Sequence, residues 1–93
     1  MCGIAGYFGN KKLTDHDLEL TAKTLSHRGP DSNGKYIKKC KNKFINLVHT
    51  RLKILDLDDR SNQPFKFGNS VLIFNGEIYN FIEIKKELIS LGH

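Results

Sequence analysis

The sequence has little cysteine and no long apolar run. Cys2 and Cys40 are the only cysteines, too few for a disulfide scaffold, and they form no Cys-x-x-Cys metal pair. No stretch approaches the roughly 20 apolar residues of a membrane span. The N-terminus also lacks the basic segment and apolar run of a signal peptide. We therefore expect a cytoplasmic protein with free thiols and no membrane partner.

Positive charge is in excess, but it is scattered. The formal net charge is +5, and lysines are spread along the chain. The densest cluster, Lys38 to Lys43, has no interleaved aromatic residues, so we expect a solvated hairpin tip with Cys40 exposed and no nucleic-acid partner. A small basic nucleic-acid binder remains an alternative that rests on charge alone. The histidines lack metal-ligand spacing, so no metal site is predicted, and His49 is expected to pack at a strand end.

The length allows one domain at most. The chain has 93 residues, of which 39% are hydrophobic and 27% are charged, and these fractions are ordinary for a folded protein. No glycine-rich phosphate loop is present, so we do not expect this chain alone to bind ATP. The sequence stops directly after a predicted helix cap. We interpret residues 1–93 as the N-terminal part of a larger domain.

Apolar patterns in the first half predict a strand, a helix and two further strands. Thr14 is a typical N-cap residue, and Asp15 and Asp17 follow in the first turn, where the helix dipole favours anions. The expected elements are a strand at 2–8, a helix at 14–26, a loop at 27–31, and strands at 34–37 and 44–48 joined by a lysine-rich turn.

The second half predicts a strand, a turn and a helix. Residues 51–57 fit either a short strand or an extended loop, and 58–64 have loop composition. A strand is expected at 71–74, followed by a turn at Asn75-Gly76. Asn80 with Glu83 resembles a capping box at the start of a helix that Gly92 would cap at its end. Phe81, Ile84, Leu88 and Leu91 would form one apolar face of this helix. The aromatic residues Phe65, Phe67 and Phe74 are expected in the core rather than as a stacking platform.

Cys2 could be a nucleophile. Initiator methionine is usually removed before a small second residue, and removal would leave a free α-amino group beside the thiol of Cys2. Both groups titrate near neutral pH, so the amine could serve as general base for the thiol and later protonate a leaving amine. From position 2 alone, an ordinary buried cysteine at the start of a strand is the commoner interpretation.

Two further positions carry polar groups suited to a carboxamide substrate. The Asn75 side chain and the Gly76 N–H could stabilise a developing oxyanion, although Asn-Gly is also common in turns. Arg51 could bind a carboxylate through two parallel hydrogen bonds, although a surface arginine is the commoner case. Arg28 and Asp31 could contact each other and order their loop, or the segment could simply be a turn.

Together these segments resemble class II glutamine amidotransferases, whose N-terminal cysteine is the nucleophile, and within them the glutaminase domain of the asparagine synthetase branch. Four motifs match in order: CGIAGYFG at 2–9, SHRGPDSNG at 26–34, HTRLKILDL at 49–57 and NGEIYN at 75–80. The pair at 63–64, Gln-Pro, also fits that branch. The resemblance covers essentially the whole chain. The sugar-phosphate and purine-pathway amidotransferases resemble it in the first motif and differ in the second and fourth.

The resemblance implies a role for each matching residue. Cys2 would attack the side-chain amide of L-glutamine and form a γ-glutamyl thioester. Asn75 and Gly76 would form the oxyanion hole, and Arg51 would hold the substrate α-carboxylate. Glu77 would belong to the same pocket. The segment Leu52, Lys53, Ile54 and Leu55 would line it, partly through backbone atoms.

The resemblance also implies an α+β fold, a four-layer α/β/β/α sandwich of which this chain would hold a part. A synthetase domain, normally in the same chain, would use ATP and magnesium to make asparagine from aspartate, and the full-length enzyme could be a homodimer. Another acceptor carboxylate, such as a sugar acid, and a truncated non-catalytic chain are the alternatives. The family's pocket aspartate lies beyond residue 93, so that contact is missing here.

Overall fold

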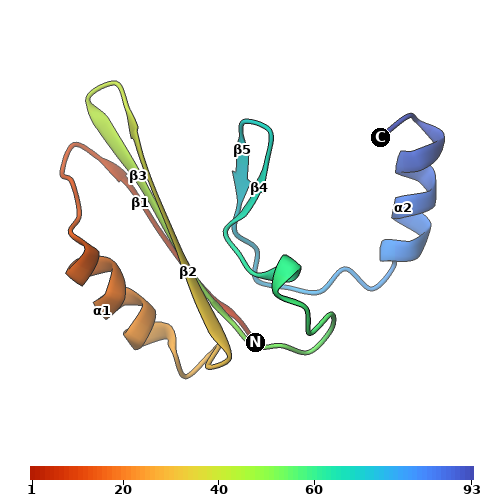
Figure 1. Ribbon diagram of the computed structural model, residues 1–93, viewed down its shortest axis with the longest axis horizontal. Helices are drawn as coiled ribbons and strands as arrows, with labels where there is room; N and C mark the ends of the chain where they lie inside the picture. The colour runs from red at the N-terminus through yellow and green to blue at the C-terminus, as the bar shows by residue number, and fades with distance from the viewer.

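The computed structural model describes all 93 residues as a mixed α+β structure with two small antiparallel sheets (Figure 1). The elements in chain order are β1 (Gly3–Gly9), α1 (Asp15–Leu25), β2 (Ser32–Cys40), β3 (Lys43–Arg51), the short 3-10 helix η1 (Asp59–Ser61), β4 (Phe65–Phe67), β5 (Ser70–Leu72) and α2 (Phe81–Ser90). The helices have 11 and 10 residues, so neither is long enough to cross a bilayer.

The main sheet has three strands in the order β1-β3-β2, with β3 in the centre. His49 of β3 lies opposite Ile4 of β1 and Gly34 of β2. The strands expected in this region are confirmed. Strands β2 and β3 extend further than predicted at both ends, because they stay paired from Ser32 and Arg51 to a hairpin that closes with only Lys41 and Asn42 between them. Lys41 adopts a φ of 57° there. The lysine cluster is thus a hairpin tip, and Cys40 is exposed, as expected.

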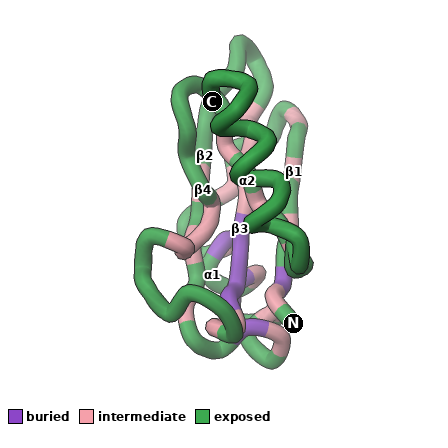
Figure 2. The backbone as a smooth tube through the Cα atoms, turned by 90° about the vertical axis from the view of Figure 1, so that its right-hand side faces the viewer, coloured by how far each residue is buried: buried purple, intermediate pink, exposed green.

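Helix α1 covers one face of this sheet. The predicted N-cap is confirmed, because the Thr14 hydroxyl accepts from the Asp17 N–H at 3.1 Å and the Asp17 carboxylate accepts from the Thr14 N–H at 2.8 Å. The bond from the Thr14 N–H, together with a second one that the Thr14 hydroxyl donates to the same carboxylate at 2.8 Å, lowers the pKa of Asp17. Leu18 and Ala22 of the helix pack with Val48 of β3 and form the core. The buried residues concentrate around this contact (Figure 2).

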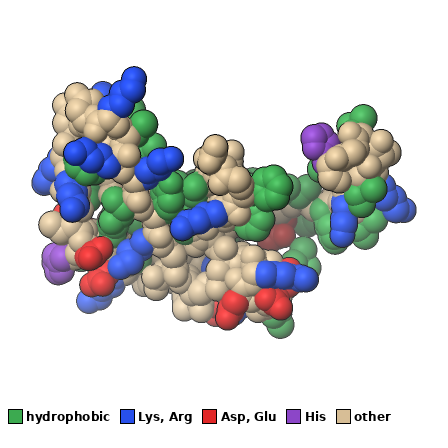
Figure 3. Space-filling view, turned by 45° about the horizontal axis from the view of Figure 1, so that its top comes forward, with side chains coloured by type: hydrophobic (Ala, Val, Ile, Leu, Met, Phe, Trp, Pro, Cys, Tyr) green, Lys and Arg blue, Asp and Glu red, His purple; other side chains and the backbone are tan.

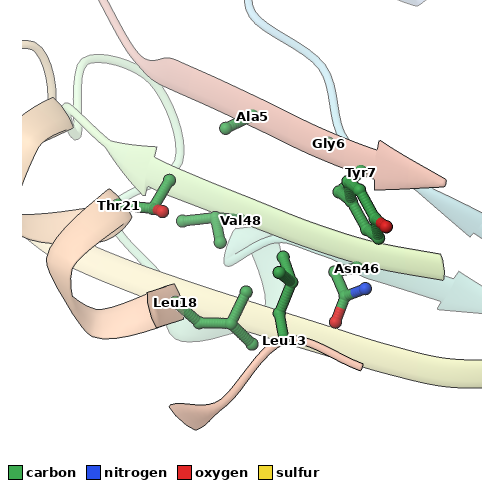
Figure 4. Close-up of a pocket in the computed structure, with 8 residues that line it drawn as sticks. All are labelled: Ala5, Gly6, Tyr7, Leu13, Leu18, Thr21, Asn46 and Val48. Atoms are coloured by element: carbon green, nitrogen blue, oxygen red, sulfur yellow. The ribbon is translucent and has the colours of Figure 1, made fainter. Parts of the chain in front are cut away.

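A cavity of about 90 Å³ lies between α1 and the sheet. Figure 4 shows Leu18 and Thr21 of the helix on one side and Val48 and Asn46 of β3 on the other. Asn46 is 1% exposed, and neither polar atom of its side chain has a hydrogen-bond partner. The cavity contains neither Cys2 nor Asn75, so it is separate from the predicted site.

The segment after β3 crosses to the opposite face of the sheet, where the β4–β5 hairpin lies (Figure 1). Residues 52–58 form an irregular loop, which decides between the two alternatives for that stretch. Strand β4 was not predicted. Phe65, Phe67 and Phe74 are 48%, 80% and 39% exposed, so the expectation that they are buried is wrong for this chain. They are exposed because no further layer covers this side.

Helix α2 forms where the sequence predicts it, but its surroundings differ. Asn80 makes no side-chain cap, so the predicted capping box is absent. The C-terminal cap is confirmed: Gly92 has a φ of +89°, and the N–H groups of Gly92 and His93 donate to Ile89 and Leu88. Every residue of α2 is exposed, so its apolar face is uncovered in this structure. Hydrophobic side chains are visible on the surface around this helix (Figure 3).

The overall dimensions show that the chain is less compact than a closed globule, in line with its few buried residues. The radius of gyration is 15.0 Å, compared with about 12 Å for a closed globule of this length. Helix α2 stands clear of the main sheet (Figure 1). The observed layers are therefore α1 on the three-stranded sheet, with a two-stranded hairpin on the other side.

Candidate active site

A cavity of about 300 Å³ lies next to the N-terminus and contains several of the predicted site residues. This volume is sufficient for a small-molecule substrate. It is lined by Met1, Cys2, Ile54, Asn75, Gly76, Glu77 and Tyr79. The fold thus places Cys2 in one cavity with residues more than 70 positions later in the sequence. Arg51, Leu52, Lys53 and Leu55 do not line it.

Cys2 is half-buried directly before β1. Its Sγ atom lies 3.9 Å from the Leu52 carbonyl oxygen, and its own carbonyl accepts from Arg28 Nε at 3.0 Å. Met1 precedes it and is 70% exposed at the edge of the cavity. In this form the nitrogen of Cys2 is a peptide nitrogen, which cannot act as a base until Met1 is removed.

The loop between α1 and β2 supports the site through two contacts that the sequence did not predict. Arg28 contacts Cys2, and the Asp31 carboxylate accepts from the Lys53 N–H at 2.8 Å. Arg28 and Asp31 do not pair with each other. Gly29 between them is essential for this packing, because a Cβ atom there would overlap the backbone of Thr50.

Arg51 is 5% exposed and is engaged by the loop that follows it. Its guanidinium donates to the carbonyls of Leu55, Asp56 and Asp58 and, at 2.8 Å, to Asn62 Oδ1. In this structure Arg51 therefore holds the 52–62 loop through hydrogen bonds to its carbonyls and to Asn62. Its predicted contact with a substrate carboxylate stays a prediction.

Ion pairs brace the outer side of the same loop. Lys53 Nζ lies 3.0 Å from Asp59, and Arg60 Nε lies 3.1 Å from Asp56. The pKa of Asp59 is lowered chiefly by its hydrogen bond from Lys53, and that of Asp56 chiefly by its hydrogen bond from Ser61. These carboxylates are exposed, so they order the loop rather than take part in buried acid–base chemistry.

The segment that carries Asn75 begins at Phe74, which contacts both His49 and Gln63. His49 Nε2 lies 3.3 Å from the Phe74 carbonyl oxygen, and the Phe74 N–H donates to Gln63 Oε1 at 2.6 Å. His49 is 1% exposed at the strand end, which confirms its predicted packing. Burial lowers the pKa of His49, and the charge of Arg51 adds to this effect, so the ring is neutral near pH 7.

The acidic, histidine and cysteine side chains form no group of three that could hold a metal ion. The described polar groups suit a small organic substrate with a carboxamide: a thiol, an amide side chain and a carboxylate meet at one cavity.

Comparison with known proteins decides the family. The family described as a glutamine amidotransferase domain matches residues 1–93. The chain belongs to this family. This amidotransferase domain is 35% identical to a putative glutamine-hydrolysing asparagine synthetase 2 of Methanocaldococcus jannaschii, over 94% of the chain and 20% of the relative. It is 35% identical to asparagine synthetase 1 of Bacillus subtilis, over 100% and 15%.

A different branch is also similar. The glutamine–fructose-6-phosphate aminotransferase of Pyrococcus horikoshii is 34% identical, over 100% of the chain and 20% of that protein. The amidotransferase domain thus spans about a fifth or less of the length of these relatives. No solved structure gives a significant match.

Proposed function

We propose that this amidotransferase domain hydrolyses the side-chain amide of L-glutamine, with Cys2 as nucleophile. The observation that carries the proposal is the shared cavity of Cys2, Asn75 and Gly76. A thiol, a side-chain amide and a glycine N–H are the groups that nucleophilic attack on a carboxamide requires. Family membership supports the same assignment.

The reaction begins with removal of Met1, which frees the α-amine of Cys2. The amine takes the thiol proton, and Sγ attacks the amide carbon of glutamine. Asn75 Nδ2 and the Gly76 N–H donate to the resulting oxyanion. The amine then protonates the leaving nitrogen, and ammonia departs as the γ-glutamyl thioester forms. A water molecule loses a proton to the same amine and cleaves the thioester, which releases glutamate and restores Cys2.

The α-carboxylate and α-amine of glutamine need their own partners. We assign the carboxylate to Arg51 and the amine to Glu77, with Leu52, Lys53, Ile54 and Leu55 forming the wall between them. Ile54 and Glu77 already line the cavity. Arg51 would have to exchange some of its contacts with the loop carbonyls for the substrate, which makes loop rearrangement part of binding.

The ammonia would be used by a synthetase part of the same protein for ATP-dependent conversion of aspartate to asparagine. The greater length of the named relatives supports such a part. We further propose that additional chain completes a four-layer α/β/β/α sandwich by covering the exposed aromatic residues of β4 and the apolar face of α2. Sheet faces and edges left open in this way favour pairing with further chain.

The proposal is tested by intact mass and by labelling with diazo-oxo-norleucine, an electrophile that mimics glutamine. We expect loss of Met1 and one adduct on Cys2. A processed protein without an adduct would show that the pocket is not formed. Retained Met1 would remove the base and with it the mechanism.

The acceptor requires a separate measurement. The full-length protein is incubated with glutamine and ATP and with either aspartate or a sugar acid. Glutamine-dependent formation of asparagine is expected. Amidation of the sugar acid instead would keep the glutaminase assignment and replace the acceptor.

A further inference from the structure

The main chain between β5 and α2 is held by few hydrogen bonds. No bond between main-chain groups involves residues 73–79. The only hydrogen bonds to this segment are the two at Phe74: its N–H donates to Gln63 Oε1 at 2.6 Å, and its carbonyl lies 3.3 Å from His49 Nε2. Asn75 and Gly76 follow directly and line the cavity with Cys2. These two contacts therefore fix the backbone where it enters the site.

His49 connects the Phe74 carbonyl to the central strand of the main sheet. It lies in the central strand, 1% exposed, opposite Ile4 and Gly34. Because the Phe74 carbonyl can only accept, Nε2 must carry the ring proton. Ile4 lies two residues after Cys2 on β1. Strands β1 and β3 therefore position both Cys2, directly before β1, and the Phe74 carbonyl, which His49 of β3 contacts.

Gln63 is anchored to the neighbouring strand β2, at Gly34, which lies directly opposite His49. A Cβ atom at Gly34 would overlap the Gln63 carbonyl, so the loop lies directly on β2. The neighbouring Asn62 Oδ1 accepts from Ser32 Oγ at 3.0 Å and from Arg51 at 2.8 Å. The Gln63 side-chain oxygen therefore accepts from the Phe74 N–H while its own loop is held in place by these contacts.

We propose that His49 and Gln63 are positioning residues for glutamine hydrolysis. By holding the two peptide groups of Phe74, they aim the Asn75 amide and the Gly76 N–H at the oxyanion that forms beside Cys2. This inference rests on the proposed function. Neither side chain lines the cavity, so each acts through its hydrogen bond with Phe74.

Two matched pairs of variants in the full-length protein test the inference. Gln63→Leu removes the acceptor at similar size, whereas Gln63→Glu keeps an oxygen acceptor. His49→Leu removes the donor, whereas His49→Gln keeps an N–H near the position of Nε2. We expect the leucine variants to lower kcat about 10- to 100-fold with KM changed less than about threefold, since losing one oxyanion donor costs 10²–10³. The conservative variants should recover most of kcat.

A second readout separates positioning from damage to the fold. A glutamine analogue with an aldehyde in place of the amide forms a tetrahedral adduct with Cys2, so its affinity depends on the oxyanion donors. Iodoacetamide alkylates the same thiol without an oxyanion. In Gln63→Leu the aldehyde should bind 10- to 100-fold more weakly, while the iodoacetamide rate stays within twofold of wild type. Asn69→Leu, on the exposed β4–β5 turn, is the polar-to-apolar control and should leave both unchanged.

Each other outcome contradicts the inference. Equal loss of aldehyde binding and iodoacetamide reactivity in Gln63→Leu would show a purely structural role. Full activity of Gln63→Leu would show that the contact is dispensable. If His49→Leu does not fold, the Gln63 pair still decides. A wild-type protein that reacts with iodoacetamide but neither hydrolyses glutamine nor binds the aldehyde would instead overturn the proposed function itself.

Discussion

The two halves of the molecule, residues 1–51 and 52–93, differ in how tightly their side chains are packed. All nine buried residues lie between Gly3 and Arg51, where α1 covers the main sheet, and none lies in residues 52–93. Cys2, the proposed nucleophile, precedes the first strand of the packed half, whereas Asn75 and Gly76 belong to the exposed half. The site therefore depends on joining a rigid element to a weakly held one. The positions of the oxyanion donors Asn75 and Gly76 therefore depend on specific hydrogen bonds, because no hydrophobic core surrounds their segment.

The largest expected effect lies at Cys2, the proposed nucleophile. Cys2→Ala removes the atom that forms the thioester, so we expect glutaminase activity to fall more than about 10³-fold. Activity is measured as glutamate release. Cys40→Ala is the matched control, since its thiol is exposed at the hairpin tip, and should change nothing. Equal loss in both variants would place the reactive thiol outside the proposed site.

Leucine truncation compares the packing of the two halves directly. Leu18 is 2% exposed under α1, so Leu18→Ala should lower the free energy of unfolding by about 2–5 kcal/mol. Leu88 of α2 is 45% exposed, so Leu88→Ala should cost less than about 1 kcal/mol. Thermal denaturation of the two variants gives both values. A cost at Leu88 as large as at Leu18 would mean that further chain covers α2 in the protein.

The contrast between the packed and the exposed half also explains which features the sequence could predict. Helix α1 and its cap follow from contacts within four residues, and both were predicted correctly. The burial of Phe65 and Phe67 was predicted wrongly, because burial depends on what lies opposite a residue and not on its own pattern. The site residues were predicted by resemblance to a family, and Cys2, Ile54, Asn75, Gly76 and Glu77 share a cavity. No local pattern indicates the contacts of Arg28 with Cys2 or of Gln63 with Phe74, since they join separate elements.

Acid should weaken the packed half through His49. Burial holds the pKa of His49 below its ordinary value of 6.5 in the folded state. The unfolded chain then binds the proton more readily, so stability is constant above about pH 6.5 and falls as pH drops toward the folded pKa. One such group changes the free energy of unfolding by at most about 1.4 kcal/mol per pH unit. Ile4 and Gly34 opposite it carry no charge, and Arg51 of its own strand is the charged group acting on it.

The measurement is the melting temperature between pH 7 and 5, above the range in which carboxylates titrate. His49→Gln, which cannot be protonated, is the control and should show a flatter profile than wild type. Identical slopes in the two proteins would show that the imidazole is not the titrating group.

The smallest expected effect compares the caps of the two helices. The Thr14 side chain accepts from the Asp17 N–H at the start of α1, so Thr14→Ala should cost about 1 kcal/mol. Asn80 occupies the same position before α2 but caps nothing, so Asn80→Ala should be close to neutral. Chemical denaturation measures the free energy of unfolding of both variants. If the dependence of that free energy on denaturant concentration is unchanged, a shift of the denaturation midpoint reports a change in stability alone. If Asn80→Ala costs as much as Thr14→Ala, the Asn80–Glu83 capping box forms in solution. In that case α2 would be as well defined locally as α1, and the difference between the halves would lie in tertiary packing only.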